Sequence, residues 1–225
     1  RQTSRALPEE REVVVDLPEG VHPFLLVREE DYEKLRERSG MAPWNMMKAE
    51  AIQTARVGAP FGEAISAASL AYILDPDNRE LYLNSLRQWL LEWHNIYDRV
   101  KGTRATQHSE MVAPSHEFFH SILALDIIYN DLTLEERREI IQGMDKMAGW
   151  FAQQGNSWAL NKYAVIGTWA LFRGDRETFL AAKQNYDHWL FERELTPGGV
   201  YVPGPGYAYF RLAKENVTKS FFMDI

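Results

Sequence analysis

The stretch from Ser115 to Ile140, SHEFFHSILALDIIYNDLTLEERREI, predicts two consecutive helices with a short break between them. Its first half carries apolar side chains at helical spacing: Phe118, Ile122, Leu125 and Ile128. This pattern is typical of the buried stripe of a helix. The second half opens with Thr133 followed three residues later by Glu136, a capping box that marks a helix start. We expect the two helices and their turn to form an αα-hairpin.

Helical patterns continue on both sides of this hairpin. They cover residues 28–38, 64–74, 78–97, 156–172 and 176–191, and another begins near Tyr207. Residues 1–20 read as an extended lead-in, and residues 21–225 as one domain of eight or nine antiparallel helices. Short connections between such helices indicate a closed toroid or a solenoid of hairpins. We expect five tryptophans to lie in its core: Trp44, Trp89, Trp93, Trp150 and Trp189.

Composition narrows the classes of function. The chain has 225 residues, of which 45% are hydrophobic, and a net charge of -7. This charge argues against nucleic acid or an anionic membrane as the main partner. No cysteine is present, which excludes disulfides and thiolate chemistry. No apolar run reaches the roughly 18 residues that a membrane-spanning helix needs, so we expect no membrane insertion. The apolar ending at Phe221, Phe222 and Met223 indicates a domain cut from a longer protein.

The motif His116-Glu117-Phe118-Phe119-His120 matches HExxH, the pattern of zinc peptidases. The two histidines share a helix face and could bind one metal ion, but a third ligand is required. Asp126 stands where one zinc-peptidase family has its third ligand, yet Leu123 replaces the glycine that turns the chain there. Other candidates for a third ligand lie in the next helix: Glu135, Glu136 and Glu139. We therefore expect no metal and keep zinc at His116 and His120 as an alternative, beside cleft-facing or structural histidines.

Four stretches together resemble the helical domain of the heparinase II/III-like and alginate-lyase-like polysaccharide lyases. They occur in the order of that family: VHPFLLVREEDYEKLRER from Val21, LALDIIYNDLTLEERREI from Leu123, GNSWALNKYAVIGTWALFRGD from Gly155, and TPGGVYVPGPGYAYF from Thr196. The resemblance implies an incomplete (α/α) toroid, followed in the full-length protein by a β-sandwich that is absent from this chain. It also implies β-elimination on a uronate-containing polysaccharide, without a cofactor, by a secreted or periplasmic enzyme.

The resemblance also supplies candidate residues. The catalytic candidates are Tyr207, Asn161, Asn156 and His116. Asparagine, histidine or arginine neutralises the uronate carboxylate, while tyrosine or histidine exchanges the protons. The candidates for substrate binding are Trp158, His120, Tyr209, Arg211, Arg104 and His108. Trp158 stands where some members of the family have a histidine, so His116 or His120 is the candidate for that missing imidazole.

Each candidate also has a structural interpretation. Asn156 could cap a helix, Asn161 could bond inside the domain, and Tyr207 and Tyr209 could simply pack. Two other functions stay open: a non-catalytic helical domain that binds carbohydrate or serves as a scaffold, and a zinc metallopeptidase.

Overall fold

The computed structural model describes residues 21–57, 61–106, 108–155 and 159–194. These residues form helices and connections, and no strand occurs among them. The all-α class is therefore confirmed. The expected lead-in over 1–20, the glycine-proline loop from Thr196 and the helix near Tyr207 lie outside the described residues.

Nine α-helices follow one another in the described ranges. They are α1 (Tyr32–Ser39), α2 (Trp44–Val57), α3 (Phe61–Leu74), α4 (Arg79–Leu91), α5 (Trp93–Val100), α6 (His108–Ile128), α7 (Leu134–Ala152), α8 (Ala159–Arg173) and α9 (Arg176–Trp189). Single turns η1 (Glu29–Asp31), η2 (Pro76–Asn78) and η3 (Tyr129–Asp131) precede α1, α4 and α7, and η5 (Leu190–Glu194) continues α9. The helix expected over 78–97 is two helices, because the chain bends at Glu92.

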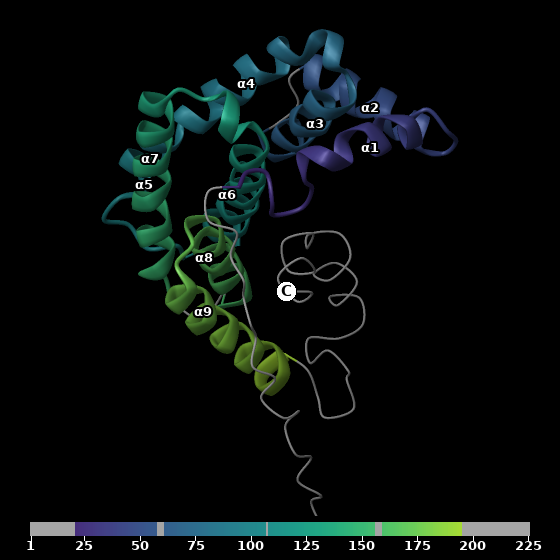
Figure 1. Cartoon of the computed structure of the whole chain (residues 1–225). Coiled ribbons are helices and arrows are strands. Elements are labelled where there is room, and N and C mark those ends of the chain that lie inside the picture. Colours follow the sequence, from purple (N-terminus) through teal and green to yellow (C-terminus); the bar gives the residue numbers. More distant parts are fainter. Residues whose placement is uncertain (1–20, 58–60, 107, 156–158, 195–225) are drawn as a thin grey trace, which may run out of the picture.

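The helices follow a curve, from α1 and α2 across α4 to α5 and α7, and then to α8 and α9 (Figure 1). Three helices pack side by side through the middle of this curve, with α6 between α3 and α8. The others cover this central row: α2 and α4 pack on α3, α7 packs on α5 and α8, and α9 packs on α8. Because α6 touches both of its neighbours in the row, most of its surface is buried.

The core is built around Phe118 of α6, which is fully buried. Its ring meets Trp93 of α5 edge-on, with ring centroids 5.0 Å apart, and lies 5.3 Å from Phe151 and 6.0 Å from Trp169. One residue thus joins four helices, and burying a side chain of this size contributes about 1.5–3 kcal/mol. The apolar stripe predicted on this helix is confirmed, since all four of its residues are fully buried.

The expected position of Trp44 in the core is wrong. Its side chain is 39% exposed at the start of α2, whereas Trp93 and Trp150 are buried as expected. Arg38 of α1 lies over the Trp44 ring, 4.6 Å from its centroid. The indole therefore has a cation on one face instead of a packed core around it.

Local signals fix where α7 and α9 begin. The Thr133 hydroxyl accepts a hydrogen bond from the Glu136 backbone N–H at 3.2 Å, and the Glu136 carboxylate accepts one from the Thr133 N–H at 2.7 Å. This is the predicted capping box. Gly174 has φ of 70° between α8 and α9, a conformation that favours glycine. The Asp175 carboxylate next to it then accepts a hydrogen bond from the Thr178 N–H at 3.0 Å and caps α9.

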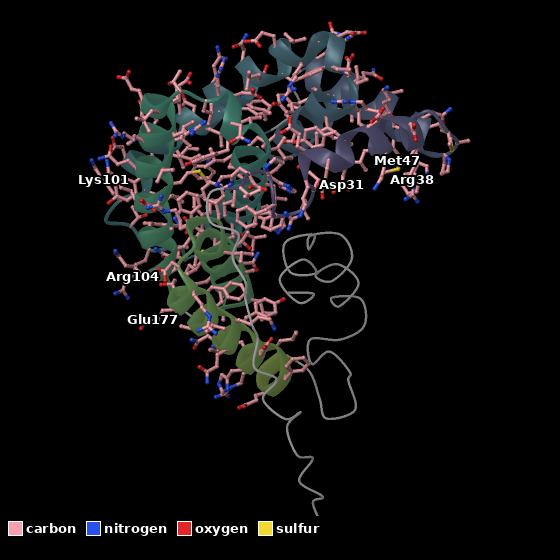
Figure 2. All side chains as sticks on the ribbon, in the orientation of Figure 1. Asp31, Arg38, Met47, Lys101, Arg104 and Glu177 are labelled. Carbon is pink, nitrogen blue, oxygen red and sulfur yellow. The ribbon has the colours of Figure 1, made fainter. Side chains whose placement is uncertain are left out.

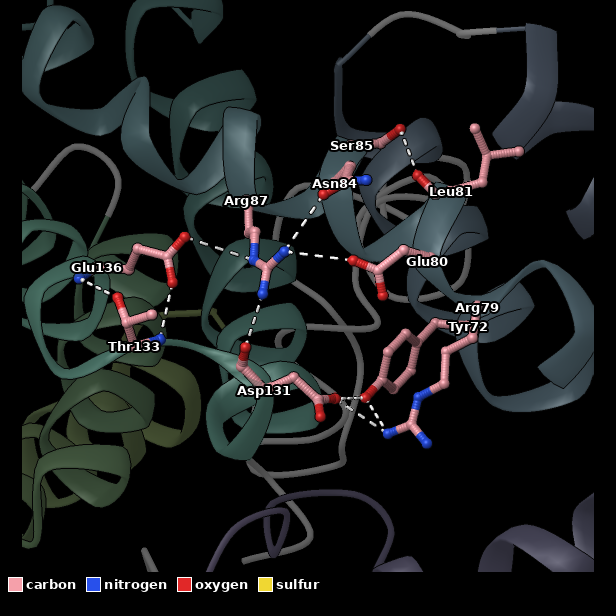
Figure 3. A network of polar contacts seen from close by, with 10 residues as sticks. All are labelled: Tyr72, Arg79, Glu80, Leu81, Asn84, Ser85, Arg87, Asp131, Thr133 and Glu136. Carbon is pink, nitrogen blue, oxygen red and sulfur yellow. Dashed lines mark hydrogen bonds and ion pairs between the residues drawn. The ribbon is translucent and has the colours of Figure 1, made fainter.

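A polar network joins α3, α4, η3 and α7 (Figure 3). Arg87 donates to the backbone oxygen of Asp131 at 2.7 Å and lies 3.5 Å from the Glu136 carboxylate. The Asp131 carboxylate accepts hydrogen bonds from Tyr72 and from Arg79. Burial raises the pKa of the Tyr72 phenol, so it stays a protonated donor. The network fixes the turn between α6 and α7.

Helices α5 and α7 approach closely at Gly143. A Cβ atom at this position would lie 2.9 Å from Cδ2 of His94 and 3.1 Å from its backbone nitrogen. The His94 ring is held there because its Nε2 is 2.8 Å from the Glu139 carbonyl oxygen. Glycine is therefore the residue that this helix contact requires.

Candidate functional site

Helix α6 has one narrow exposed stripe. Among its residues from Glu110 onward, those that are not buried are Glu110, Ala113, Pro114, His116, Glu117, His120 and Ile127. His116, Glu117 and His120 lie together on this stripe, because residues one turn apart share a helix face. The HEFFH motif thus has its two phenylalanines in the core and its three ionisable side chains half-buried at the surface.

His120 is held by the neighbouring helix. Its Nδ1 lies 2.8 Å from the Ser66 hydroxyl of α3, a hydrogen bond whose direction depends on the tautomer of the ring. Burial lowers the pKa of the imidazole. The ring therefore stays neutral over a wider pH range than a histidine in water, and a neutral imidazole accepts a proton through its unprotonated nitrogen.

Glu117 has the complementary property. Burial raises the pKa of its carboxyl group. The protonated carboxyl therefore persists to higher pH than usual and can donate a hydrogen bond or a proton. A proton donor and a proton acceptor three residues apart on one helix face are what acid–base chemistry needs. The sequence offered Glu117 only as part of the zinc motif.

Asn161 lies inside the domain, on α8. Its side-chain nitrogen donates to the Ser115 hydroxyl at 3.1 Å, and Ser115 donates in turn to the Val112 carbonyl at 2.7 Å. Asn161 is 3% exposed and Ser115 is fully buried. The asparagine therefore joins α8 to α6 beside His116, which follows Ser115 directly. Its predicted contact with a substrate carboxylate stays a prediction.

Lys162 is a buried cation that sequence reasoning did not single out. It is 9% exposed, its ammonium group donates to the Gln154 carbonyl at 2.9 Å, and burial lowers its pKa. The Gln154 side chain accepts from the Ala105 N–H at 2.9 Å and donates to the Trp150 carbonyl at 2.8 Å. Its burial could have been predicted from the sequence, because Lys162 interrupts the otherwise mostly apolar run ALNKYAVIG from Ala159.

Asp126 does not join the histidines of HEFFH. Its carboxylate lies 2.7 Å from Nδ1 of His22 and accepts hydrogen bonds from the backbone N–H groups of Phe24 at 2.9 Å and Leu25 at 2.8 Å. Helix α6 continues past Leu123 without the turn that a zinc-peptidase motif requires there. Two stretches of the family resemblance, VHPFLL and LALDIIY, therefore meet at this carboxylate.

Within the described ranges, no group of three histidine, aspartate or glutamate side chains could hold a metal ion. Of the acidic residues weighed as a third zinc ligand, Glu136 caps α7, while Glu135 and Glu139 are exposed on that helix. His116 and His120 thus share a stripe without a third ligand from the part of the chain that the structure describes.

Other predicted residues lie elsewhere. Arg104 is exposed in the connection before α6, and Figure 2 shows it projecting from the side of the curve opposite Arg38 and Met47. The side chain of His108 is outside the described residues. The same holds for Asn156, Trp158, Tyr207, Tyr209 and Arg211.

No helix in the described ranges combines the length and the apolar character needed to cross a bilayer. Comparison with protein families, with curated proteins and with solved structures finds no match to this chain.

Proposed function

We propose that the chain is the helical domain of a polysaccharide lyase that cleaves a uronate-containing polysaccharide by β-elimination. The observation that carries the proposal is the stripe of His116, Glu117 and His120 on the central helix of the curve. The resemblance of four stretches to heparinase II/III-like and alginate-lyase-like enzymes supports it. With that resemblance, we propose that the curve of helices is an incomplete (α/α) toroid, which a β-sandwich follows in the longer secreted or periplasmic protein.

The reaction needs one base, one acid and a group that neutralises the substrate carboxylate. The base removes the proton from C5 of the uronate, and its bonding electrons form the C4–C5 double bond. The C4–O bond breaks, and an acid gives a proton to the leaving glycosidic oxygen. A hydrogen-bond donor at the carboxylate stabilises the negative charge that develops as the C5 proton leaves.

We assign two of these roles to residues of the stripe. The neutral imidazole of His120, oriented by Ser66, takes the C5 proton. The protonated carboxyl of Glu117 donates a hydrogen bond to the substrate carboxylate, a role that its raised pKa favours. Asn161 positions α8 beside His116. Tyr207 protonates the leaving oxygen, as the resemblance implies.

The test measures formation of the unsaturated product on alginate, heparan, chondroitin and ulvan-type polymers, by the ultraviolet absorbance of its conjugated double bond. We expect product with at least one polymer and a loss of about 100-fold or more in kcat for His120→Gln. The matched control is His188→Gln, which removes a half-exposed histidine on α9 that pairs with Glu192. The control is expected to keep full activity and the same circular dichroism.

The pH profile separates a catalytic from a structural role of Glu117. Activity should fall at acid pH as His120 becomes protonated and at alkaline pH as Glu117 ionises. In Glu117→Gln, the group is always neutral, so the alkaline decline that it causes should disappear. Polymer binding without any product would support the non-catalytic alternative, and an unchanged rate in His120→Gln would contradict the assignment.

A further inference from the structure

A groove outside the proposed catalytic stripe opens between α1, α2 and α3. Its volume is about 290 Å³, and its walls are almost wholly apolar. The apolar lining consists of Leu35, Trp44, Met47, Leu70 and Leu74. Trp44 is 39% exposed, Leu70 37% and Met47 53%, so a set of large apolar side chains meets solvent here. Exposed apolar surface that gathers in a groove marks a binding site more often than scattered apolar residues do.

Two cations stand at the rim of this groove. Arg38 comes from α1 and Lys48 from α2, and both belong to its lining. Figure 2 shows Arg38 and Met47 together at the same end of the curve. The guanidinium group of Arg38 is held over the Trp44 ring, 4.6 Å from its centroid. Within the described ranges, neither cation forms an ion pair with a carboxylate. The groove therefore offers two positive charges, of which Lys48 also helps to lower the pKa of the nearby Asp75 carboxyl.

The groove is unsuited to a sugar. The one hydroxyl in its lining, on Ser39, already donates to the Arg36 carbonyl at 2.7 Å. Arg38 covers a face of the Trp44 ring, where a sugar would stack. The lining instead fits a hydrocarbon group that carries a negative charge at one end. A volume of about 290 Å³ lies near the lower limit of small-molecule sites.

We propose that this groove binds a single-chain anionic amphiphile, with the hydrocarbon chain between α1, α2 and α3 and the carboxylate at Arg38 and Lys48. The hydrocarbon chain covers Met47, Leu70 and Leu74, which removes apolar surface from water. The guanidinium fork of Arg38 is suited to a carboxylate, since two of its N–H groups can bond both oxygens. This inference is independent of the proposed lyase activity.

The test titrates the whole chain with dodecanoate, below its micelle concentration, by isothermal calorimetry. A cationic amphiphile of the same chain length, dodecyltrimethylammonium, measures the contribution of charge. We expect dodecanoate to bind at least about tenfold more tightly than the cation. Octanoate should bind at least about tenfold more weakly than dodecanoate, because it buries four fewer methylene groups.

Three variants locate the site. Met47→Glu places a charge on an exposed groove wall without disturbing the core, and should abolish binding. Arg38→Gln with Lys48→Gln should weaken dodecanoate binding by about tenfold without weakening the binding of dodecyltrimethylammonium, which loses a repulsion. The matched control is Arg138→Gln with Lys146→Gln, which removes two exposed cations from α7 and should leave dodecanoate affinity unchanged.

Several results would overturn the inference. Equal affinity for the two amphiphiles would show that charge is not recognised. Dodecanoate affinity that survives Met47→Glu would place its site elsewhere. If sedimentation shows that Met47→Glu dissociates a dimer of the chain, the groove is a contact between copies and the inference fails. No binding of dodecanoate at all would also refute it.

Discussion

Asp126→Ala is expected to detach residues 21–27 from α6. The carboxylate of Asp126 is the common acceptor for His22 Nδ1 and for two backbone N–H groups, at 2.7, 2.9 and 2.8 Å. The residue is 1% exposed, so water does not compete for these bonds in the folded protein. Alanine leaves all three groups without their acceptor.

The magnitude follows from the number and kind of these bonds. A hydrogen bond to a charged group contributes about 1.5–3 kcal/mol, and three such bonds end at this carboxylate. We expect a loss of about 4 kcal/mol in the free energy of unfolding, less than the sum of three bonds. The sum overstates the loss because residues 21–27 can detach and regain hydrogen bonds to water.

His22→Phe is the matched partial variant. The His22 ring lies 4.0 Å from the Tyr129 ring and 4.9 Å from the Phe172 ring, between centroids. Phenylalanine preserves these contacts and loses only the bond to Asp126, so it should cost about 1.5–3 kcal/mol. Because the two residues are in contact, their effects should not add. The double variant should lose at least about 1 kcal/mol less free energy of unfolding than the sum of the losses in the two single variants.

The assay is urea unfolding followed by circular dichroism, with hydrogen exchange of the Phe24 and Leu25 amides as the local measurement. Both amides should exchange faster in Asp126→Ala, while those of α7 exchange as before. A loss below about 1 kcal/mol, or unchanged exchange of both amides, would refute the view that this carboxylate fastens the segment.

Three further predictions concern stability. Thr133→Ala should lower the free energy of unfolding by about 1 kcal/mol, as urea unfolding would show, because α7 loses its cap. Gly143→Ala should destabilise the protein by about 1–3 kcal/mol, because the added Cβ meets His94. Gly149→Ala should stabilise it by about 0.5–1 kcal/mol, because the added Cβ meets no other atom and alanine favours a helix. Equal shifts of the thermal unfolding midpoint in the two variants would contradict this prediction. Burial raises the pKa of Glu117, so wild-type stability should fall as pH rises through the window above the ordinary glutamate range. Glu117→Gln lacks this fall and should be more stable at about pH 7 but not at about pH 4, as urea unfolding at both would show.

The helices were predictable where short-range patterns decide them. The capping box at Thr133 and the apolar stripe through Phe118 depend on residues within one or two turns. The bend at Glu92 is not visible in the local pattern. It occurs where the Trp93 ring packs on Phe118, a residue about 25 positions later in the chain. Trp44 was assigned to the core from its residue type, but exposure depends on what the neighbouring helices leave uncovered.

The candidate site was predictable only in part. Helical spacing placed His116 and His120 on one face, and that placement is confirmed. The raised pKa of Glu117 was not foreseen, because burial at this position is set by surrounding helices and not by the motif. The motif suggests Asp126 as a metal ligand, but the partner of its carboxylate is His22. The two residues are 104 positions apart in the sequence, so no local pattern predicts their contact.

The hydrogen bonds from residues 21–27 to the Asp126 carboxylate have a consequence for synthesis of the chain. On the ribosome these residues emerge before all the described helices. Helix α6 follows some eighty residues later, and α8 and α9, against which Phe24 and Leu25 pack, emerge later still. Helices α1 to α4 pack mostly on one another and can form in the meantime. The sequence HPFLLV therefore stays exposed while most of the domain is made, and its docking is a late step of folding. A delay between α5 and α8 would lengthen the time during which chaperones or neighbouring chains can capture this apolar segment.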